Sequence, residues 1–193
     1  MWLVLVLLFA PLDTLTFSQA KKLYFEAVDG NGEALVKSQE LLRDSASSPV
    51  AQAYAGSLQL LQSDRTLALW RKGRLAKEGL EMLDRAVKAA PDNLEIRFLR
   101  AASTMHLPGF FKRSEQSEAD LAQIAPRVAA AAESGLIERR IAAAALFYHG
   151  VNLQRRSDWA GAESAWRTAT AIGPQTRAGI DAAAKLRTKA EIR

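Results

Sequence analysis

The sequence predicts an all-α fold in which antiparallel helical hairpins stack as a short, irregular solenoid. Apolar residues recur every three or four positions over most of the chain, which is the period of an amphipathic helix. Apolar residues make up 49% of the chain and alanine dominates them; alanine costs no side-chain entropy in a helix. No segment shows the strict alternation of a half-buried strand, so the sequence predicts helices throughout.

Length, charge and cysteine content narrow the class of protein. A chain of 193 residues is long enough to bury a core, and we expect a single domain at residues 21–193. The net charge of +5 suits an anionic partner, but arginine and lysine are interspersed with aspartate and glutamate, as on an ordinary solvated surface. The absence of cysteine excludes a disulfide framework, a cysteine-ligated zinc and a lipid-modified N-terminal cysteine.

Residues 1–20 are expected to be a signal peptide. The apolar run at residues 2–10 is too short to span a bilayer as a helix, which needs about 20 residues. Ser18 and Ala20 are small residues at the spacing that a signal peptidase prefers, so cleavage after Ala20 would give a periplasmic or secreted protein. The missing Lys or Arg before the apolar run argues against this. The alternatives are an uncleaved anchor, with peripheral membrane association through the N-terminus, and a buried N-terminal strand or helix.

Turn and capping residues divide the first half of the chain into helices. Residues 29–32 (DGNG) are a turn cluster, and Pro49 suits the first turn of the helix that follows it. Gly56 lies inside that helix, where glycine costs up to about 1 kcal/mol relative to alanine, so we expect a neighbouring helix to approach it closely. Residues 66–73 are either an inserted turn of helix or the beginning of the next helix. The helices expected here cover residues 21–28, 33–43, 50–62 and 75–90.

Proline and glycine also mark turns and helix ends in the second half of the chain. Residues 91–93 (PDN) form a turn, and residues 107–114 (LPGFFKRS) cannot continue a helix because Pro108 lacks an amide donor. Pro126 is expected to open a separate short helix that residues 134–135 (SG) close. The helices expected here cover residues 94–105, 115–124, 126–132, 138–153, 158–172 and 175–191.

Residues 146–174 form the most complete helical hairpin in the sequence, with Asp158 as the expected N-cap of its second helix. Trp159 and Trp166 are seven apart on that helix, which is the spacing of core residues. Residues 79–91 repeat the spacing of the second helix and its terminating proline. The residues that define the hairpin are Leu146, Gly150, Leu153, Ala162, Trp166, Ala169 and Pro174.

This hairpin resembles a tetratricopeptide repeat (TPR), a unit of about 34 residues made of two antiparallel helices. Gly150 and Ala162 stand at the small positions of the repeat, Trp166 at its large aromatic position and Pro174 at its terminal proline. Residues 53–120 also look like bacterial TPR-like proteins that have no established activity. The resemblance implies a right-handed helical stack whose groove binds an extended or helical segment of another protein.

Five residues are candidates for a partner-binding groove. Arg97 and Arg100 lie three apart on one helix and could bind a partner carboxylate bidentately, although local ion pairs on a solvated face are the simpler interpretation. Phe110 and Phe111 either offer an aromatic anchor or fill the gap where the repeat is broken, and we favour the second interpretation. His149 is interpreted as a core or interface residue rather than a metal ligand or general base.

The sequence contains no His-Glu-x-x-His, phosphate-binding loop or Gly-x-Ser-x-Gly motif. We therefore expect no catalysis, cofactor or metal. The leading hypothesis is an exported interaction or scaffold module whose partner is another protein, with no specific nucleic acid. One alternative is binding of an anionic polymer or membrane surface through the dispersed basic residues and the helix at residues 175–191. An enzyme with a site in the helical stack is the least favoured alternative.

Overall fold

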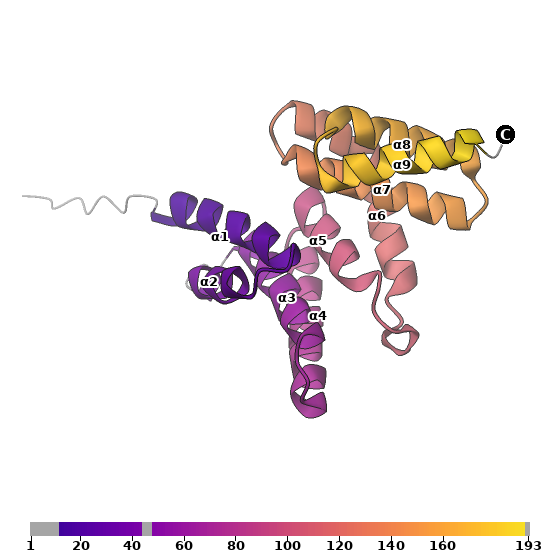
Figure 1. Ribbon diagram of the computed structural model, residues 1–193. Helices are drawn as coiled ribbons and strands as arrows, with labels where there is room; N and C mark the ends of the chain where they lie inside the picture. The colour runs from indigo at the N-terminus through magenta and orange to yellow at the C-terminus, as the bar shows by residue number, and fades with distance from the viewer. Residues whose placement is uncertain (1–11, 44–47, 192–193) are drawn as a thin grey trace, which may run out of the picture. The chain divides into compact units, whose positions relative to one another are not determined.

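A computed structural model describes residues 12–43 and 48–191, and every regular element in these ranges is helical (Figure 1). This confirms the prediction of an all-α fold built from packed helical hairpins. The elements are α1 (Leu12–Val28), α2 (Gly32–Arg43), α3 (Pro49–Asp64), α4 (Leu69–Ala89), α5 (Leu94–Thr104), the 3-10 turn η1 (Gly109–Phe111), α6 (Ser114–Glu133), α7 (Arg139–Arg155), α8 (Trp159–Ile172) and α9 (Arg177–Glu191).

Contacts gather the chain into two compact units that divide between Met82 and Leu83, inside α4. The first unit contains α1, α2, α3 and most of α4. The second contains the end of α4 and the helices from α5 onward. The single domain at residues 21–193 stays a prediction.

In the first unit, α1 and α2 form a hairpin around the predicted turn. Gly30 has a φ of +113°, which glycine adopts without strain. The side-chain oxygen of Asn31 accepts hydrogen bonds from the amides of Glu33 (3.0 Å) and Ala34 (3.1 Å), which caps the start of α2. Local turn chemistry therefore explains why the chain reverses here.

α3 packs on both helices of this hairpin, and its Tyr54 contacts α1. The Tyr54 ring is buried and lies edge-on to the rings of Tyr24 and Phe17, with centroids 4.8 and 5.8 Å away. The hydroxyl of Tyr24 also hydrogen-bonds to that of Ser57 on α3, at 2.9 Å. These aromatic contacts make the centre of the first core.

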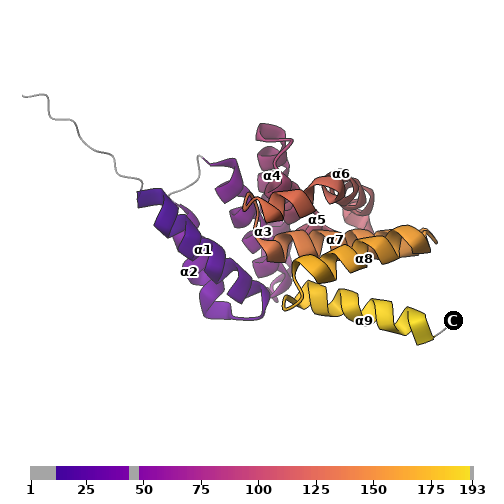
Figure 2. The same ribbon diagram turned by 90° about the horizontal axis from the view of Figure 1, so that it is seen from above.

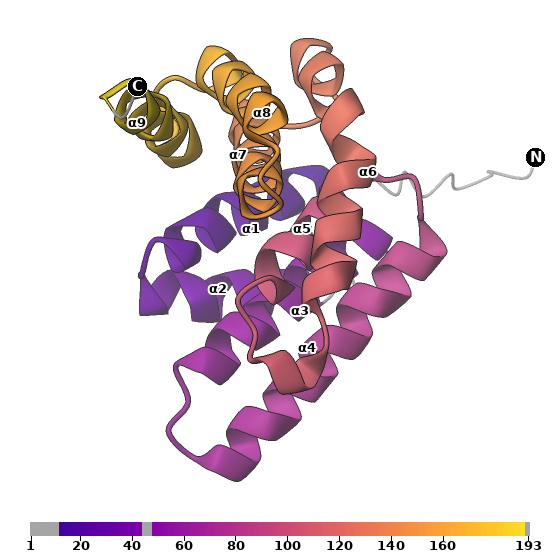
Figure 3. The ribbon, with the colours of Figure 1, turned by 90° about the vertical axis from the view of Figure 1, so that its right-hand side faces the viewer.

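α3 and α4 lie side by side and approach closely at two glycines (Figure 3). A Cβ placed on Gly79 would stand 2.7 Å from the carbonyl oxygen of Gly56, closer than real side chains come. This confirms the close approach predicted for Gly56. The helical part of residues 66–73 begins at Leu69, as the first turn of α4.

α1 begins before the predicted signal-peptide cleavage point. Ala20 is buried, and its carbonyl accepts a 2.9 Å hydrogen bond from the Ser38 hydroxyl on α2. The apolar run at residues 2–10 lies outside the described residues, so the signal peptide and export stay predictions. Within residues 12–43 and 48–191 no helix is both long and apolar enough to cross a membrane.

In the second unit, α5 pairs with α6 and α7 with α8, and α9 packs on both α7 and α8 (Figure 2). The α7–α8 hairpin contains the helical hairpin predicted at residues 146–174. A Cβ on Gly150 would stand 2.5 Å from Nε1 of Trp166, so the small residue makes room for the buried indole. The indole N–H donates to the carbonyl of Phe147 (3.2 Å), and Asp158 caps α8 by accepting from Gly161 N (2.9 Å).

Two local predictions in this unit are wrong. Pro126 does not open a new helix, because α6 runs without a break through it. Pro126 and Ala122, whose carbonyl loses its helical donor, are both exposed, so water can replace the missing bond. Trp159 is exposed rather than in the core, because it is the first residue of α8 and adjoins the polar turn.

Candidate functional site

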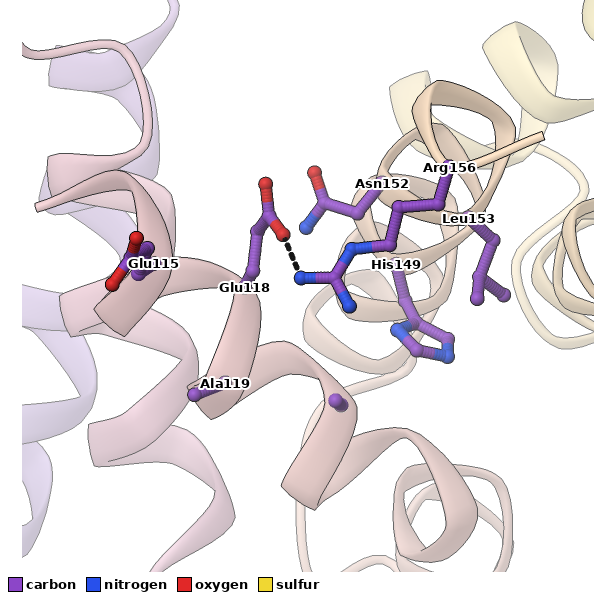
Figure 4. Close-up of a pocket in the computed structure, with 8 residues that line it drawn as sticks. Glu115, Glu118, Ala119, His149, Asn152, Leu153 and Arg156 are labelled. Atoms are coloured by element: carbon purple, nitrogen blue, oxygen red, sulfur yellow. Dashed lines mark hydrogen bonds and ion pairs between the residues drawn. The ribbon is translucent and has the colours of Figure 1, made fainter. Parts of the chain in front are cut away.

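A cavity of about 250 Å³ opens between α6 and α7 in the second unit (Figure 4). Each helix contributes four residues at the spacing i, i+3, i+4, i+7, which places them on one helical face. The lining residues are Glu115, Glu118, Ala119 and Ala122 from α6, His149, Asn152 and Leu153 from α7, and Arg156, the C-cap of α7.

An ion pair crosses the cavity from one helix to the other. Nη2 of Arg156 lies 2.6 Å from a carboxylate oxygen of Glu118. Figure 4 shows Arg156 and Asn152 reaching from α7 toward Glu118, with His149 on the same side of α7. The Arg156 side chain is largely exposed, so this pair contributes at most about 1 kcal/mol to stability.

Asn152 carries the least satisfied polar group of the cavity. Its side chain is buried, yet Nδ2 has no hydrogen-bond partner among the residues that the structure describes. A buried donor without a partner costs about 1–3 kcal/mol. An amide nitrogen has two hydrogens to donate, so a bound group with an accepting oxygen would remove that cost if the Asn152 side chain turned to bring Nδ2, which now has almost no exposed surface, to the cavity.

His149 adds a neutral polar group to the same wall. Burial lowers the pKa of its imidazole, and the charge of Asp158 opposes this only in part. The neutral ring offers one donor and one acceptor at neutral pH. With Ala119, Ala122 and Leu153 as apolar surface, the cavity suits a small polar segment such as a peptide unit. Within the described ranges, no three His, Asp or Glu side chains gather to hold a metal ion.

Arg97 and Arg100 bind a carboxylate of the chain itself. Asp120 on α6 is buried and accepts from Nη1 of Arg97 (2.6 Å), and from Nε (2.7 Å) and Nη2 (2.9 Å) of Arg100. The bidentate geometry expected for a partner carboxylate is therefore present inside the molecule. Asp120 was not predicted from the sequence as the partner of these arginines. Its position beside Leu121 in an apolar helical stripe is a signal of a buried charge.

The network continues from Arg100 to the start of α6. Nη1 of Arg100 lies 3.2 Å from Asp84, whose other oxygen lies 2.9 Å from Nη1 of Arg113. Burial alone would lower the pKa of Arg100, but the hydrogen bonds and charges of Asp120 and Asp84 outweigh it and raise the pKa above its usual value. These five charges tie the end of α4 to α5 and α6.

The loop between α5 and α6 does not bury its aromatic pair. Phe110 is 77% exposed and Phe111 is half-buried, with ring centroids 4.4 Å apart. The prediction that both rings fill the gap in the repeat is wrong for Phe110. Thr104 at the end of α5 and Ser117 in the first turn of α6 are buried beside this loop, and their hydroxyls hydrogen-bond to each other at 2.8 Å.

The structure separates the five candidate residues. His149 lines the cavity, whereas Arg97 and Arg100 belong to the internal network and Phe110 and Phe111 to the loop. The cavity residues that the sequence did not single out, chiefly Asn152 and Glu118, share the helical spacing described above. That spacing is visible in the sequence, but it identifies a site only once α6 and α7 are known to face each other.

A scan against protein-family models found no match to this chain, and neither did searches of curated proteins and of solved structures. The resemblance of the α7–α8 hairpin to a TPR stays a prediction from residues such as Gly150, Trp166 and Pro174.

Proposed function

We propose that the protein is an exported, TPR-like interaction or scaffold module that binds a segment of another protein in the α6–α7 cavity. The observation that carries this proposal is the buried amide nitrogen of Asn152, which has no partner among the described residues. A peptide carbonyl is an acceptor of the right kind, since every residue of an extended segment presents one.

The surroundings of Asn152 also favour a peptide over an anionic ligand. Arg156 and Glu118 neutralise each other across the cavity, Glu115 adds a negative charge to the lining, and His149 is held in its neutral form at neutral pH. Ala119 and Leu153 supply apolar contact for a side chain of the bound segment. Such a site recognises backbone atoms and modest side chains, which is the chemistry of an interaction module and not that of bond cleavage.

Selection from a library of random peptides tests the proposal with the purified full chain. We expect selected peptides to bind with micromolar affinity, and Asn152→Leu to weaken binding about tenfold or more, since about 1.4 kcal/mol corresponds to tenfold. Gln123→Leu removes an exposed amide on α6 outside the cavity and should leave affinity unchanged. Peptides that bind both variants equally would place binding elsewhere and refute the role of the cavity.

Export has its own test. N-terminal sequencing of the protein from its native source should find Lys21 as the first residue if cleavage follows Ala20. The mature chain would then lack Phe17 and its ring contact with Tyr54. A mature chain that retains residues 1–20 would contradict the proposed processing while leaving the peptide site untouched.

A further inference from the structure

The connection between α3 and α4 displays large apolar side chains to solvent. We define the α3–α4 tip as residues 65–74, at the free end of the α3–α4 hairpin in the first unit (Figure 3, lower left). The exposed fractions are 97% for Leu67, 83% for Leu69 and 72% for Trp70. Single exposed apolar residues are ordinary, but three large ones within four positions form a patch, and such patches mark interaction sites.

Hydrogen bonds hold the tip in this exposed conformation. The Ser63 hydroxyl donates to the carbonyl of Lys72 (2.9 Å), and the Thr66 hydroxyl donates to that of Gln62 (2.7 Å). The amide of Lys72 donates to the carbonyl of Ala68 (2.8 Å), which begins the first turn of α4. The backbone is thus fixed on both sides of Leu67 and Leu69, while their side chains pack against almost nothing.

Positive charge surrounds the apolar patch. The ten residues of the tip contain no aspartate or glutamate, and the guanidinium of Arg74 lies 5.5 Å from the centroid of the Trp70 ring. Two acids outside the tip lie beside its cations: Asp64 is 3.7 Å from Nζ of Lys72, and Glu78 is 3.9 Å from Nε of Arg74. The cations of the tip are Arg65, Arg71, Lys72 and Arg74.

We propose that the α3–α4 tip inserts into the interface of an anionic membrane. Leucine and tryptophan side chains enter the boundary between headgroups and acyl chains, where tryptophan is favoured. Arginine and lysine beside them bind the anionic headgroups. The proposal does not depend on the peptide site, which lies on other helices.

The shape and composition of the tip favour a membrane over a macromolecular partner. A protein partner would have to offer a pocket for each of three protruding side chains, whereas a bilayer accepts them without shape complementarity. Nucleic acid would engage Arg71 and Lys72 but would leave Leu67 and Leu69 in water. An anionic bilayer satisfies both the apolar and the basic side chains at once.

A site-specific probe tests the insertion with the full chain. Because the chain has no cysteine, Leu67→Cys can be labelled alone with a polarity-sensitive fluorophore. Vesicles of phosphatidylcholine with about 30% phosphatidylglycerol should shift the emission to the blue and raise its intensity, whereas pure phosphatidylcholine should change it little. The matched control is Leu136→Cys, at a residue that is 73% exposed in the second unit, and its emission should not respond.

Charge reversal supplies the second measurement. Arg71→Glu with Lys72→Glu should raise the lipid concentration for half of the response about tenfold or more, since each basic residue near an anionic surface contributes to binding. Circular dichroism checks that this variant folds. If the label at residue 67 does not respond to anionic vesicles, or if the label at residue 136 responds equally, the tip is not a membrane anchor. Binding through the N-terminus alone would give the first of these results and would overturn the proposal.

Discussion

Asp120→Ala should strongly destabilise the second unit. The Asp120 side chain is only 2% exposed, and its two oxygens accept three hydrogen bonds from Arg97 and Arg100, at 2.6, 2.7 and 2.9 Å. Alanine removes the carboxylate that both arginines bind. The side chains of Arg97 and Arg100 are only 13% and 11% exposed, so water cannot fully replace it. The expected loss of stability comes from leaving these guanidinium charges partly buried without the opposite charge of Asp120.

The structure sets the size of the effect. Breaking a buried ion pair by removing one partner costs about 3–5 kcal/mol. Arg100 keeps Asp84 at 3.2 Å, and Nε of Arg97 keeps the carbonyl of Pro91 at 2.5 Å. These remaining partners place the expected loss in the free energy of unfolding near the lower limit, at about 3 kcal/mol.

Urea unfolding followed by far-ultraviolet circular dichroism measures the loss. With a typical slope of about 1–3 kcal/mol per molar urea, the midpoint should fall by about 1 M or more. Asp181→Ala is the matched control, because Asp181 pairs at 3.0 Å with Arg177, whose side chain is almost fully exposed. That variant should change the free energy of unfolding by about 0.5 kcal/mol or less.

An apolar replacement of the whole cluster separates charge from packing. Changing Arg97 and Arg100 to methionine together with Asp120→Leu removes all three charges and keeps much of the volume. Such replacements of buried ion clusters are often neutral or stabilising, so most of the lost stability should return. Equal midpoints for Asp120→Ala and Asp181→Ala, or a triple variant as unstable as Asp120→Ala, would refute the reasoning.

Three further predictions concern glycine packing and pH. Gly79→Ala should destabilise the fold by about 1–2 kcal/mol, because the new Cβ would meet the backbone of α3. Gly73→Ala in the same helix is the control: its Cβ would have nothing within 4 Å, so the change should stabilise the fold by up to about 1 kcal/mol. Thermal unfolding compares the two variants. Gly150→Ala should destabilise by about 1–2 kcal/mol and change the near-ultraviolet circular dichroism of Trp166, whose indole it would contact. Burial lowers the pKa of His149, so the unfolded chain binds a proton at this residue more readily than the folded chain does. The stability of the fold is therefore complete above pH about 6.5 and decreases as the pH falls through the pKa of the folded state. His149→Gln should reduce this pH dependence, which urea unfolding at pH 7 and 5 measures.

The packing of a small or large residue could be predicted from the sequence where only one physical reason explains why that residue stands there. A glycine inside an apolar helix weakens that helix, so close approach was the only gain that could explain Gly56, and Gly79 is the residue that approaches it. The sequence placed Gly150 at a small position and Trp166 at the large aromatic position of a two-helix repeat, and the structure brings the two into contact. In both cases the relevant partner lies on the adjacent helix in sequence, and a short connection limits the choice of partner.

Long-range polar contacts were not predictable in the same way. The sequence shows that Arg97 and Arg100 share a helical face, but several carboxylates could reach that face, and only the packing of α6 on α5 selects Asp120. Pro126 shows a related limit. A proline disturbs a helix less where water can bond to the carbonyl that lost its donor. Which side of α6 faces water depends on how α6 packs against other helices, and the local sequence does not show this.

α6 separates the polar groups of the second unit into two sets. On the side toward α5, Ser117 and Asp120 are buried and fully paired with Thr104 and the two arginines. On the side toward α7, the helix presents Glu115, Glu118 and small apolar residues to a cavity in which Nδ2 of Asn152 has no partner among the described residues. The arginines that suggested carboxylate binding in the sequence are therefore occupied by structural contacts. The proposed peptide site therefore depends on the neutral polar atoms of His149 and Asn152 on α7, and we expect its ligand to present an uncharged acceptor such as a peptide carbonyl.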